Sequence, residues 1–153
     1  MIKVMFVCHG NICRSPMAEF VLKDLVNKRG ISDKFKIASS ATSCEELGNN
    51  IHYGTRAKLT EKGVPFENRR AVRFQKTDYD EYDYILVMDT ANIRGLLRII
   101  GQDTKGKIKR FKDFADGGDI ADPWYTGNFD DTYRDISKSS EAFLRCLEER
   151  CII

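Results

Sequence analysis

Apolar runs and segments of helical periodicity alternate along the whole chain. A strand buried on both faces of a parallel sheet carries few polar residues, and runs of this kind predict strands at residues 2–7 and 84–88. Residues 35–40 are expected to form a short second strand, and residues 107–111 can supply a fourth. Apolar residues at steps of three or four, often bounded by Gly or Pro, predict helices at residues 16–29, 54–62, 90–100 and 129–151. Alternating strands and helices are typical of an α/β fold with a parallel sheet.

The composition fits one compact globular domain spanning residues 1–153. The chain is 42% hydrophobic and 31% charged, which excludes a disordered or fibrous protein. Its 25 Lys and Arg nearly balance its 23 Asp and Glu, so the net charge of +2 does not point to a nucleic-acid partner. The apolar run at the start is much shorter than the ~20 residues of a membrane span. We therefore expect a cytoplasmic monomer with no membrane partner.

The five cysteines are an odd number in a chain that we expect to fold in a reducing compartment. Disulfide scaffolds need an oxidising compartment and usually an even count. The thiols are therefore candidates for chemistry or for simple burial. The two histidines, His9 and His52, lie far apart and no Cys-x-x-Cys pair is present, which argues against a zinc site.

The octet Cys8 to Ser15 follows the first predicted strand and precedes the first predicted helix. Ligands of open parallel sheets bind beyond the carboxyl ends of the strands, and the N-terminus of a helix attracts anions. Gly10 and Asn11 readily enter the left-handed region, which lets successive amides curl inward. Arg14 adds a planar fork that matches two phosphate oxygens. The octet therefore predicts a phosphate-binding loop.

Cys8 stands at the mouth of this predicted loop. A cysteine there would be held as a thiolate, because the amides, the helix dipole and Arg14 stabilise its negative charge. A thiolate beside a phosphate cradle predicts attack on phosphorus, and the Ser15 hydroxyl could help the thiolate leave in a second step. The spacing of Cys8 and Arg14 alone occurs often by chance, but the preceding strand and the Ser-Pro that opens a helix make it specific.

The segment from Val7 to Glu19 closely resembles the signature of low-molecular-weight protein tyrosine phosphatases, and the resemblance continues at 39–43, 46–49, 88–89 and 122–125. It implies a three-layer α/β fold, with a central four-stranded parallel sheet, helices on both faces, no metal and no cofactor. It also implies hydrolysis of phosphotyrosine in a protein or peptide, and of aryl phosphates, through a phosphocysteine intermediate. Inorganic phosphate would be the product.

A phenolate leaving group, whose conjugate acid has a pKa of about 10, leaves faster if a carboxylic acid protonates it. The irregular stretch 113–127 holds four candidate aspartates, and the residues alone do not choose among them: Asp113, Asp116, Asp119 and Asp122. The resemblance selects Asp122, because Asp-Pro followed by two aromatic residues is the family's general-acid motif. Trp124 and Tyr125 then offer aromatic walls for a substrate ring, although the family more often has Tyr in place of Trp124.

The resemblance also implies that Asn11 braces the loop through hydrogen bonds with Ser39 and Ser15. Relatives often carry a His in that brace, and this chain has Asn68 there. The basic run 69–73, together with Lys76, is expected to form a solvated edge of the molecule, and steering of anionic phosphopeptides to the site is the alternative.

Ile12 and Glu45 are expected to complete the pocket wall, with His9 at the rim, whereas His52 is expected to be simply exposed. Cys13 lies inside the loop, where a reversible disulfide with Cys8 would shield the nucleophile, as the resemblance also implies. The remaining cysteines are expected to serve packing: Cys44, Cys146 and Cys151.

Three alternatives use the same loop. An arsenate reductase needs two further thiols near the middle of the chain, but no Cys occurs between residues 45 and 145. A protein-arginine phosphatase usually has Thr where Ile12 stands, and an apolar side chain suits a phenyl ring better. A non-enzymatic phosphate-binding module would gain nothing from a cysteine at the attacking position, Cys8.

Overall fold

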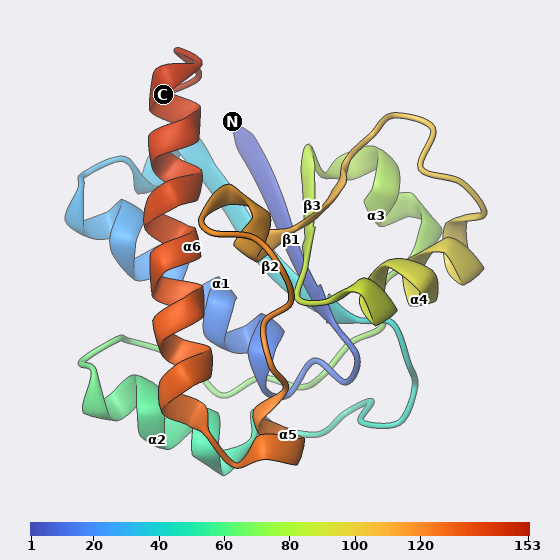
Figure 1. Ribbon diagram of the computed structural model, residues 1–153, viewed down its shortest axis with the longest axis vertical. Coiled ribbons are helices and arrows are strands. Elements are labelled where there is room, and N and C mark those ends of the chain that lie inside the picture. The colour runs from blue at the N-terminus through green and yellow to red at the C-terminus, as the bar shows by residue number, and fades with distance from the viewer.

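The computed structural model describes residues 1–153 and contains one four-stranded sheet, in the order β2-β1-β3-β4, with every neighbouring pair parallel (Figure 1). Each strand lies within two residues of its predicted position: β1 (Ile2–Cys8), β2 (Phe35–Ala41), β3 (Tyr84–Val87) and β4 (Ile108–Arg110). The apolar runs at 4–8 of β1 and 84–87 of β3 are unbroken because alternate side chains pack into the cores on opposite faces of the sheet. Phe6 of β1 belongs to one core and Val7 to the other.

Helices cover both faces of the sheet, which confirms the predicted three-layer α/β fold. On one face lie α1 (Arg14–Lys28) and α6 (Phe129–Glu149), and on the other lie α3 (Lys76–Glu81) and α4 (Thr90–Ile100) (Figure 1). The remaining helices are α2 (Tyr53–Glu61), α5 (Pro123–Thr126) and two short 3-10 helices, η1 (Ser32–Lys34) and η2 (Phe111–Phe114). None of the helices combines the length and the apolarity that a membrane crossing requires.

Some boundaries differ from the prediction for identifiable reasons. Helix α3 was not predicted, because it buries only Tyr79 and shows no apolar periodicity. It begins at a reciprocal cap, in which Gln75 N donates to Asp78 Oδ2 at 2.8 Å. The stretch 113–127 is not wholly irregular either, since the single turn of α5 lies within it.

The expectation that three cysteines serve packing is wrong for two of them. Cys44 is exposed on the loop after β2, and Cys146 is half-buried on α6. The final helix ends at Glu149, so Cys151 lies beyond it, exposed and in a left-handed conformation with φ of 55°. The apolar spacing that suggested a longer helix therefore does not bury Cys151.

Candidate active site

The octet Cys8 to Ser15 connects β1 to α1 at the carboxyl edge of the sheet. Cys8 is the last residue of β1, and α1 begins at Arg14, two residues before the predicted start. Only Asn11 enters the left-handed region, with φ of 59°, so the expectation that Gly10 does so too is wrong. Gly10 serves a different purpose, because a Cβ there would lie 3.2 Å from Cγ of Glu46. The absence of a side chain lets the loop after β2 approach closely.

The Cys8 thiol lies at the floor of a pocket of about 100 Å³. Its Sγ is 3.0 Å from Ser15 Oγ and accepts a hydrogen bond from Asn11 N at 3.3 Å. The thiol is buried, with 3% of the residue exposed. All four residues expected to form the wall line this pocket: Ile12, Glu45, Trp124 and Tyr125. Glu46, which was not predicted to line the pocket, does so as well.

Arg14 is the buried cation of the site. Its Nη1 donates to Asp89 Oδ2 at 2.6 Å and to the carbonyl of Ile120 at 2.9 Å, while Nη2 lies 3.4 Å from Asp122 Oδ2. Burial acts to lower the pKa of Arg14, but the Cys8 charge and the hydrogen bond to Asp89 outweigh it and raise that pKa. The Arg14 guanidinium therefore stays charged, and its hydrogen bonds to Asp89 and to the Ile120 carbonyl fix its orientation.

Asp89 was not singled out as a site residue by the sequence, although it lies in one of the motifs that carry the resemblance. Its Oδ1 caps α4 by accepting from Asn92 N at 2.8 Å, and its Oδ2 accepts from Arg14. An aspartate directly after a buried strand and before a helix is a recognisable cap signal. Only the folded structure adds that its second oxygen holds the guanidinium of Arg14.

Asp122 is the one candidate acid that lines the pocket. It caps α5, where its Oδ1 accepts from Trp124 N at 3.1 Å. The backbone of Asp122 is extended, and Pro123 is the first residue of the helix. The other three aspartates engage basic side chains away from the pocket: Asp113 and Asp119 on Arg110, and Asp116 near Lys112. The structure thus distinguishes Asp122 from the other three aspartates by its position at the pocket, a distinction that the sequence alone could not make.

Asn11 makes the bracing hydrogen bonds that the resemblance implied, but a different residue completes the brace. Asn11 Nδ2 donates to Ser15 Oγ at 2.8 Å and to Ser39 Oγ at 3.0 Å. Asn68 does not take part, since its Oδ1 accepts from Asn50 instead. Arg69 Nη2 reaches Asn11 Oδ1 at 3.0 Å. Arg69 is only partly exposed, so the expectation of a solvated basic edge is wrong at this position.

The comparisons with known proteins agree with this geometry. A sequence model of the family described as low molecular weight phosphotyrosine protein phosphatase matches residues 3–151. The chain belongs to this family. The low molecular weight protein-tyrosine-phosphatase YfkJ of Bacillus subtilis is 39% identical over 152 residues, which cover 97% of each chain.

Solved structures of phosphatases share the fold along almost the whole chain. The crystal structure of Bacillus subtilis YfkJ matches with a TM-score of 0.93 at 38% identity, covering 98% of this chain and 96% of YfkJ. SP-PTP, a low molecular weight protein tyrosine phosphatase of Streptococcus pyogenes, matches with a TM-score of 0.88 at 40% identity, covering 96% and 93%. The Drosophila arginine phosphatase DARP also matches, with a TM-score of 0.87 at 29% identity, covering 96% and 98%.

In this low molecular weight phosphatase, His52 supports the wall of the pocket, so the expectation that it is merely exposed is wrong. Its Nδ1 caps α2 by accepting from Gly54 N at 3.0 Å. Its ring lies 5.5 Å from the Phe129 ring, stacked, and 5.5 Å from Trp124, edge-on. A Cβ at Gly54 would collide with the Phe129 ring, so glycine is required there. Burial and the charge of Arg56 lower the pKa of His52.

The second loop thiol of this phosphatase is buried beside the first. Burial, the Cys8 charge and Asp122 raise the pKa of Cys13 to about 12, so its thiol stays protonated at neutral pH. His9 lies half-exposed at the rim, where its Nε2 is 3.0 Å from Glu45 Oε2.

Proposed function

We propose that this protein is a cytoplasmic protein tyrosine phosphatase that hydrolyses phosphotyrosine in a protein or peptide through a phosphocysteine intermediate. One observation carries the proposal: Cys8 Sγ lies at the floor of a small pocket, hydrogen-bonded to Asn11 N, with Arg14 and Asp122 lining the same pocket. A nucleophile, an anion-binding loop and an acid thus converge on one space. Aryl phosphates are substrates of the same kind, and inorganic phosphate is the product.

In the first step, the Cys8 thiolate attacks phosphorus in line with the bond to the phenolic oxygen. The sulfur–phosphorus bond forms as the phosphorus–oxygen bond breaks, while Arg14 and the loop amides bind the three other oxygens. Asp122, protonated at this stage, gives its proton to the departing phenolate. Tyrosine leaves, and the phosphoryl group remains on Cys8.

In the second step, water attacks the phosphocysteine. Asp122, now a carboxylate, removes a proton from the water as the water oxygen bonds to phosphorus. The sulfur–phosphorus bond breaks, and the electron pair returns to Cys8 as a thiolate. Ser15 Oγ lies 3.0 Å from Cys8 Sγ and can donate a hydrogen bond to it as it leaves. Phosphate is released and Asp122 is again protonated.

The walls favour an aromatic leaving group, because Ile12, Trp124 and Tyr125 present apolar and aromatic surface around the opening. Hydrolysis of phosphoarginine is the second candidate, because Glu45 and Glu46 also line the pocket and carboxylates pair well with guanidinium groups. DARP, named an arginine phosphatase, has the same fold.

Parallel assays on one peptide sequence carrying phosphotyrosine, phosphoserine or phosphoarginine test the substrate. We expect the phosphotyrosine peptide to turn over fastest, whereas faster release from phosphoarginine would favour the second candidate. The matched variant is Cys8→Ser, which keeps the shape of the loop but lacks a thiolate. Its turnover should fall about 10⁴-fold or more, with phosphate binding, measured by calorimetry, largely intact. Full activity in Cys8→Ser would exclude the mechanism.

A further inference from the structure

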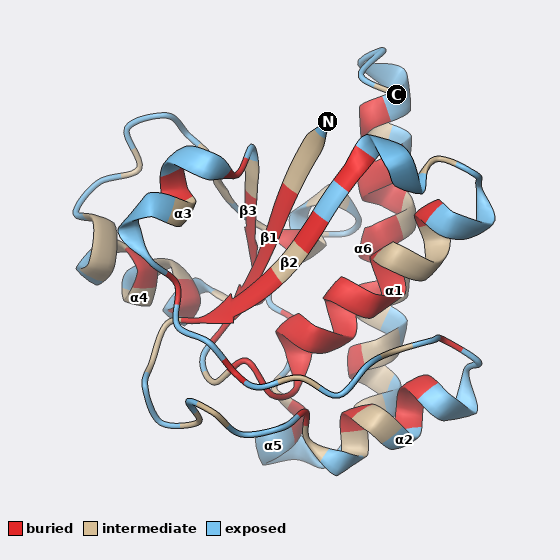
Figure 2. Cartoon of the chain, turned by 180° about the vertical axis from the view of Figure 1, so that it is seen from behind, coloured by how far each residue is buried: buried red, intermediate tan, exposed pale blue.

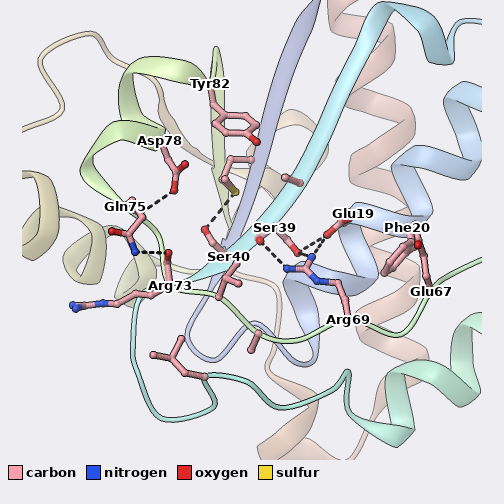
Figure 3. A pocket seen from close by; sticks show the side chains of 15 residues that line it. Glu19, Phe20, Ser39, Ser40, Glu67, Arg69, Arg73, Gln75, Asp78 and Tyr82 are labelled. Atoms are coloured by element: carbon pink, nitrogen blue, oxygen red, sulfur yellow. Dashed lines mark hydrogen bonds and ion pairs between the residues drawn. The ribbon is translucent and has the colours of Figure 1, made fainter.

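Arg69 lies behind the phosphate loop, on the segment between α2 and α3, and does not line the active-site pocket. Its Nη1 donates to Ser39 Oγ at 2.5 Å and pairs with Glu19. Its Nη2 donates to Asn11 Oδ1 at 3.0 Å and to the Ser39 carbonyl at 3.1 Å. Figure 3 shows the Arg69 fork directed at Glu19 and Ser39. Four bonds from one planar group require an arginine, since a lysine offers no such fork.

The partner that gives Arg69 its importance is Asn11. Asn11 is the only residue of the loop in the left-handed region, which asparagine enters more readily than other residues with a Cβ but still at an energetic cost. Its side chain is almost fully buried, and both of its ends are engaged. Oδ1 accepts from Arg69 and from Val72 N at 3.2 Å, while Nδ2 donates to Ser15 and Ser39. These contacts hold the turn that directs Asn11 N at Cys8 Sγ.

We propose that Arg69 is a positioning residue of the phosphatase, which holds Asn11 in its left-handed turn and so keeps the phosphate loop in the form that binds and attacks. The proposal rests on the proposed function of that loop. A continuous path of hydrogen bonds supports it, running from Arg69 through Asn11 and Ser15 to Cys8. Without Arg69, the side-chain oxygen Oδ1 of Asn11 accepts only from Val72 N, and the turn loses its charged partner.

The charge balance around Arg69 makes its removal testable. Glu19 is buried, and its Oε2 also accepts from Lys23 Nζ at 2.6 Å, while its Oε1 accepts from Ser39 Oγ at 2.6 Å. Removing Arg69 therefore leaves Glu19 with a cation and a hydroxyl rather than as an isolated buried charge. We expect the fold to survive the substitution.

Arg69 lines a cavity of about 840 Å³ that Cys8 does not line, and this cavity is open to solvent. Figure 3 shows the side chains that line it. Glu19 and Ser39, which bind the guanidinium, both line this cavity. Free guanidinium can therefore reach the space left by Arg69→Ala and hydrogen-bond to the same oxygens. A side chain that only filled space would not be replaced in this way.

The test compares Arg69→Ala and Arg69→Lys with the wild type on p-nitrophenyl phosphate, at a temperature where each protein is folded by circular dichroism. We expect kcat/KM to fall about 10–100-fold in Arg69→Ala, which is the scale for misplaced reacting groups, and Arg69→Lys to recover little. Added guanidinium should restore part of the Arg69→Ala activity, whereas methylammonium should not. Arg70→Ala is the matched control, since Arg70 is exposed and donates only to the Gly48 carbonyl.

Several results would overturn the proposal. The first is a folded Arg69→Ala protein with the kcat/KM of the wild type. The second is a fall in kcat/KM that is equally large in Arg70→Ala, and the third is a fall in Arg69→Ala that added guanidinium does not relieve. A wild-type protein inactive on every phosphate ester would refute the proposed function instead. The affinity for inorganic phosphate, measured by calorimetry, then decides the role of Arg69: weaker binding by Arg69→Ala supports it and unchanged binding overturns it.

Discussion

The phosphate loop and the wall of its pocket are built in opposite ways. Cys8, Asn11 and Arg14 are 3%, 2% and 3% exposed, and hydrogen bonds fix each of their side chains. The wall residues Trp124 and Tyr125 are 56% and 82% exposed, on the short helix α5, which Figure 2 shows at the surface. A buried network thus holds the groups proposed to react, while the side chains proposed to contact the substrate are exposed. Mutation should therefore separate chemistry from recognition.

Asp122 joins the two regions, because it caps the wall helix and also reaches the loop arginine. Asp122→Asn keeps an oxygen that can accept from Trp124 N, but an amide cannot act as a general acid or a general base. We expect kcat for a phosphotyrosine peptide to fall about 10²–10³-fold, as for other general acids. The fall should be smaller for p-nitrophenyl phosphate, whose leaving group needs less protonation.

The control for this prediction is Asp119→Asn, since Asp119 lies on the same segment but binds Arg110 and Thr90. Its kcat should stay close to the wild-type value. Equal losses in Asp122→Asn for both leaving groups would contradict the role of Asp122 as the acid.

Trp124 tests the wall alone. Replacing it by alanine removes an aromatic contact with the substrate ring, which is worth about 0.5–1.5 kcal/mol beyond buried area. We therefore expect KM for a phosphotyrosine peptide to rise about 2- to 10-fold with kcat nearly unchanged. Trp124→Phe should retain most of the affinity. A loss of kcat as large as that of Asp122→Asn would show that the wall and the loop are not separable.

The smallest expected effect is on the pH dependence of the free energy of unfolding, through His52, whose ring packs against Trp124 of the wall. Its folded pKa lies below the usual 6.5, so the unfolded chain binds the proton more readily. Stability is full above about pH 6.5 and declines as the pH falls through that value towards the folded pKa. Protonation would also remove the Nδ1 acceptor that caps α2.

His52→Asn separates these two contributions, because asparagine caps a helix without titrating near neutral pH. Melting temperatures at about pH 5 and about pH 8 should differ less in His52→Asn than in the wild type. An identical pH dependence in both proteins would contradict the assignment to His52.

The buried framework was the predictable part of the fold. Strand β3 and helix α4 were found within one residue, because a long apolar run and a strong helical period followed each other across the cap residue Asp89. Helix α3 was missed, since its stability comes from a cap and one buried tyrosine rather than from an apolar face. Local pattern therefore predicts elements that bury a whole face, and it misses those that the rest of the fold holds in place.

The site divides along similar lines. Cys8, Arg14 and the turn at Asn11 were predictable because they are adjacent in the chain and follow a strand. Arg69 was not, since nothing local distinguishes it from Arg70 and Arg73 in the same basic run. Its proposed role depends on contact with Asn11, 58 residues away in the sequence, and the buried carboxylate of Glu19 that it also binds is 50 residues away, so tertiary contact alone identifies it.

The start of α1 has a consequence for the folding equilibrium of the whole chain. Its first turn contains no acidic residue, and the Cys13 side chain makes no capping bond. The free backbone amides at the start of α1 therefore have no carboxylate of this helix to bind. Phosphate bound in the proposed site would supply the oxygens that a capping aspartate supplies in other helices. At about 100 times its dissociation constant, phosphate would add roughly 2.7 kcal/mol to the free energy of unfolding. We therefore expect the melting temperature of the protein to rise with the phosphate concentration around it.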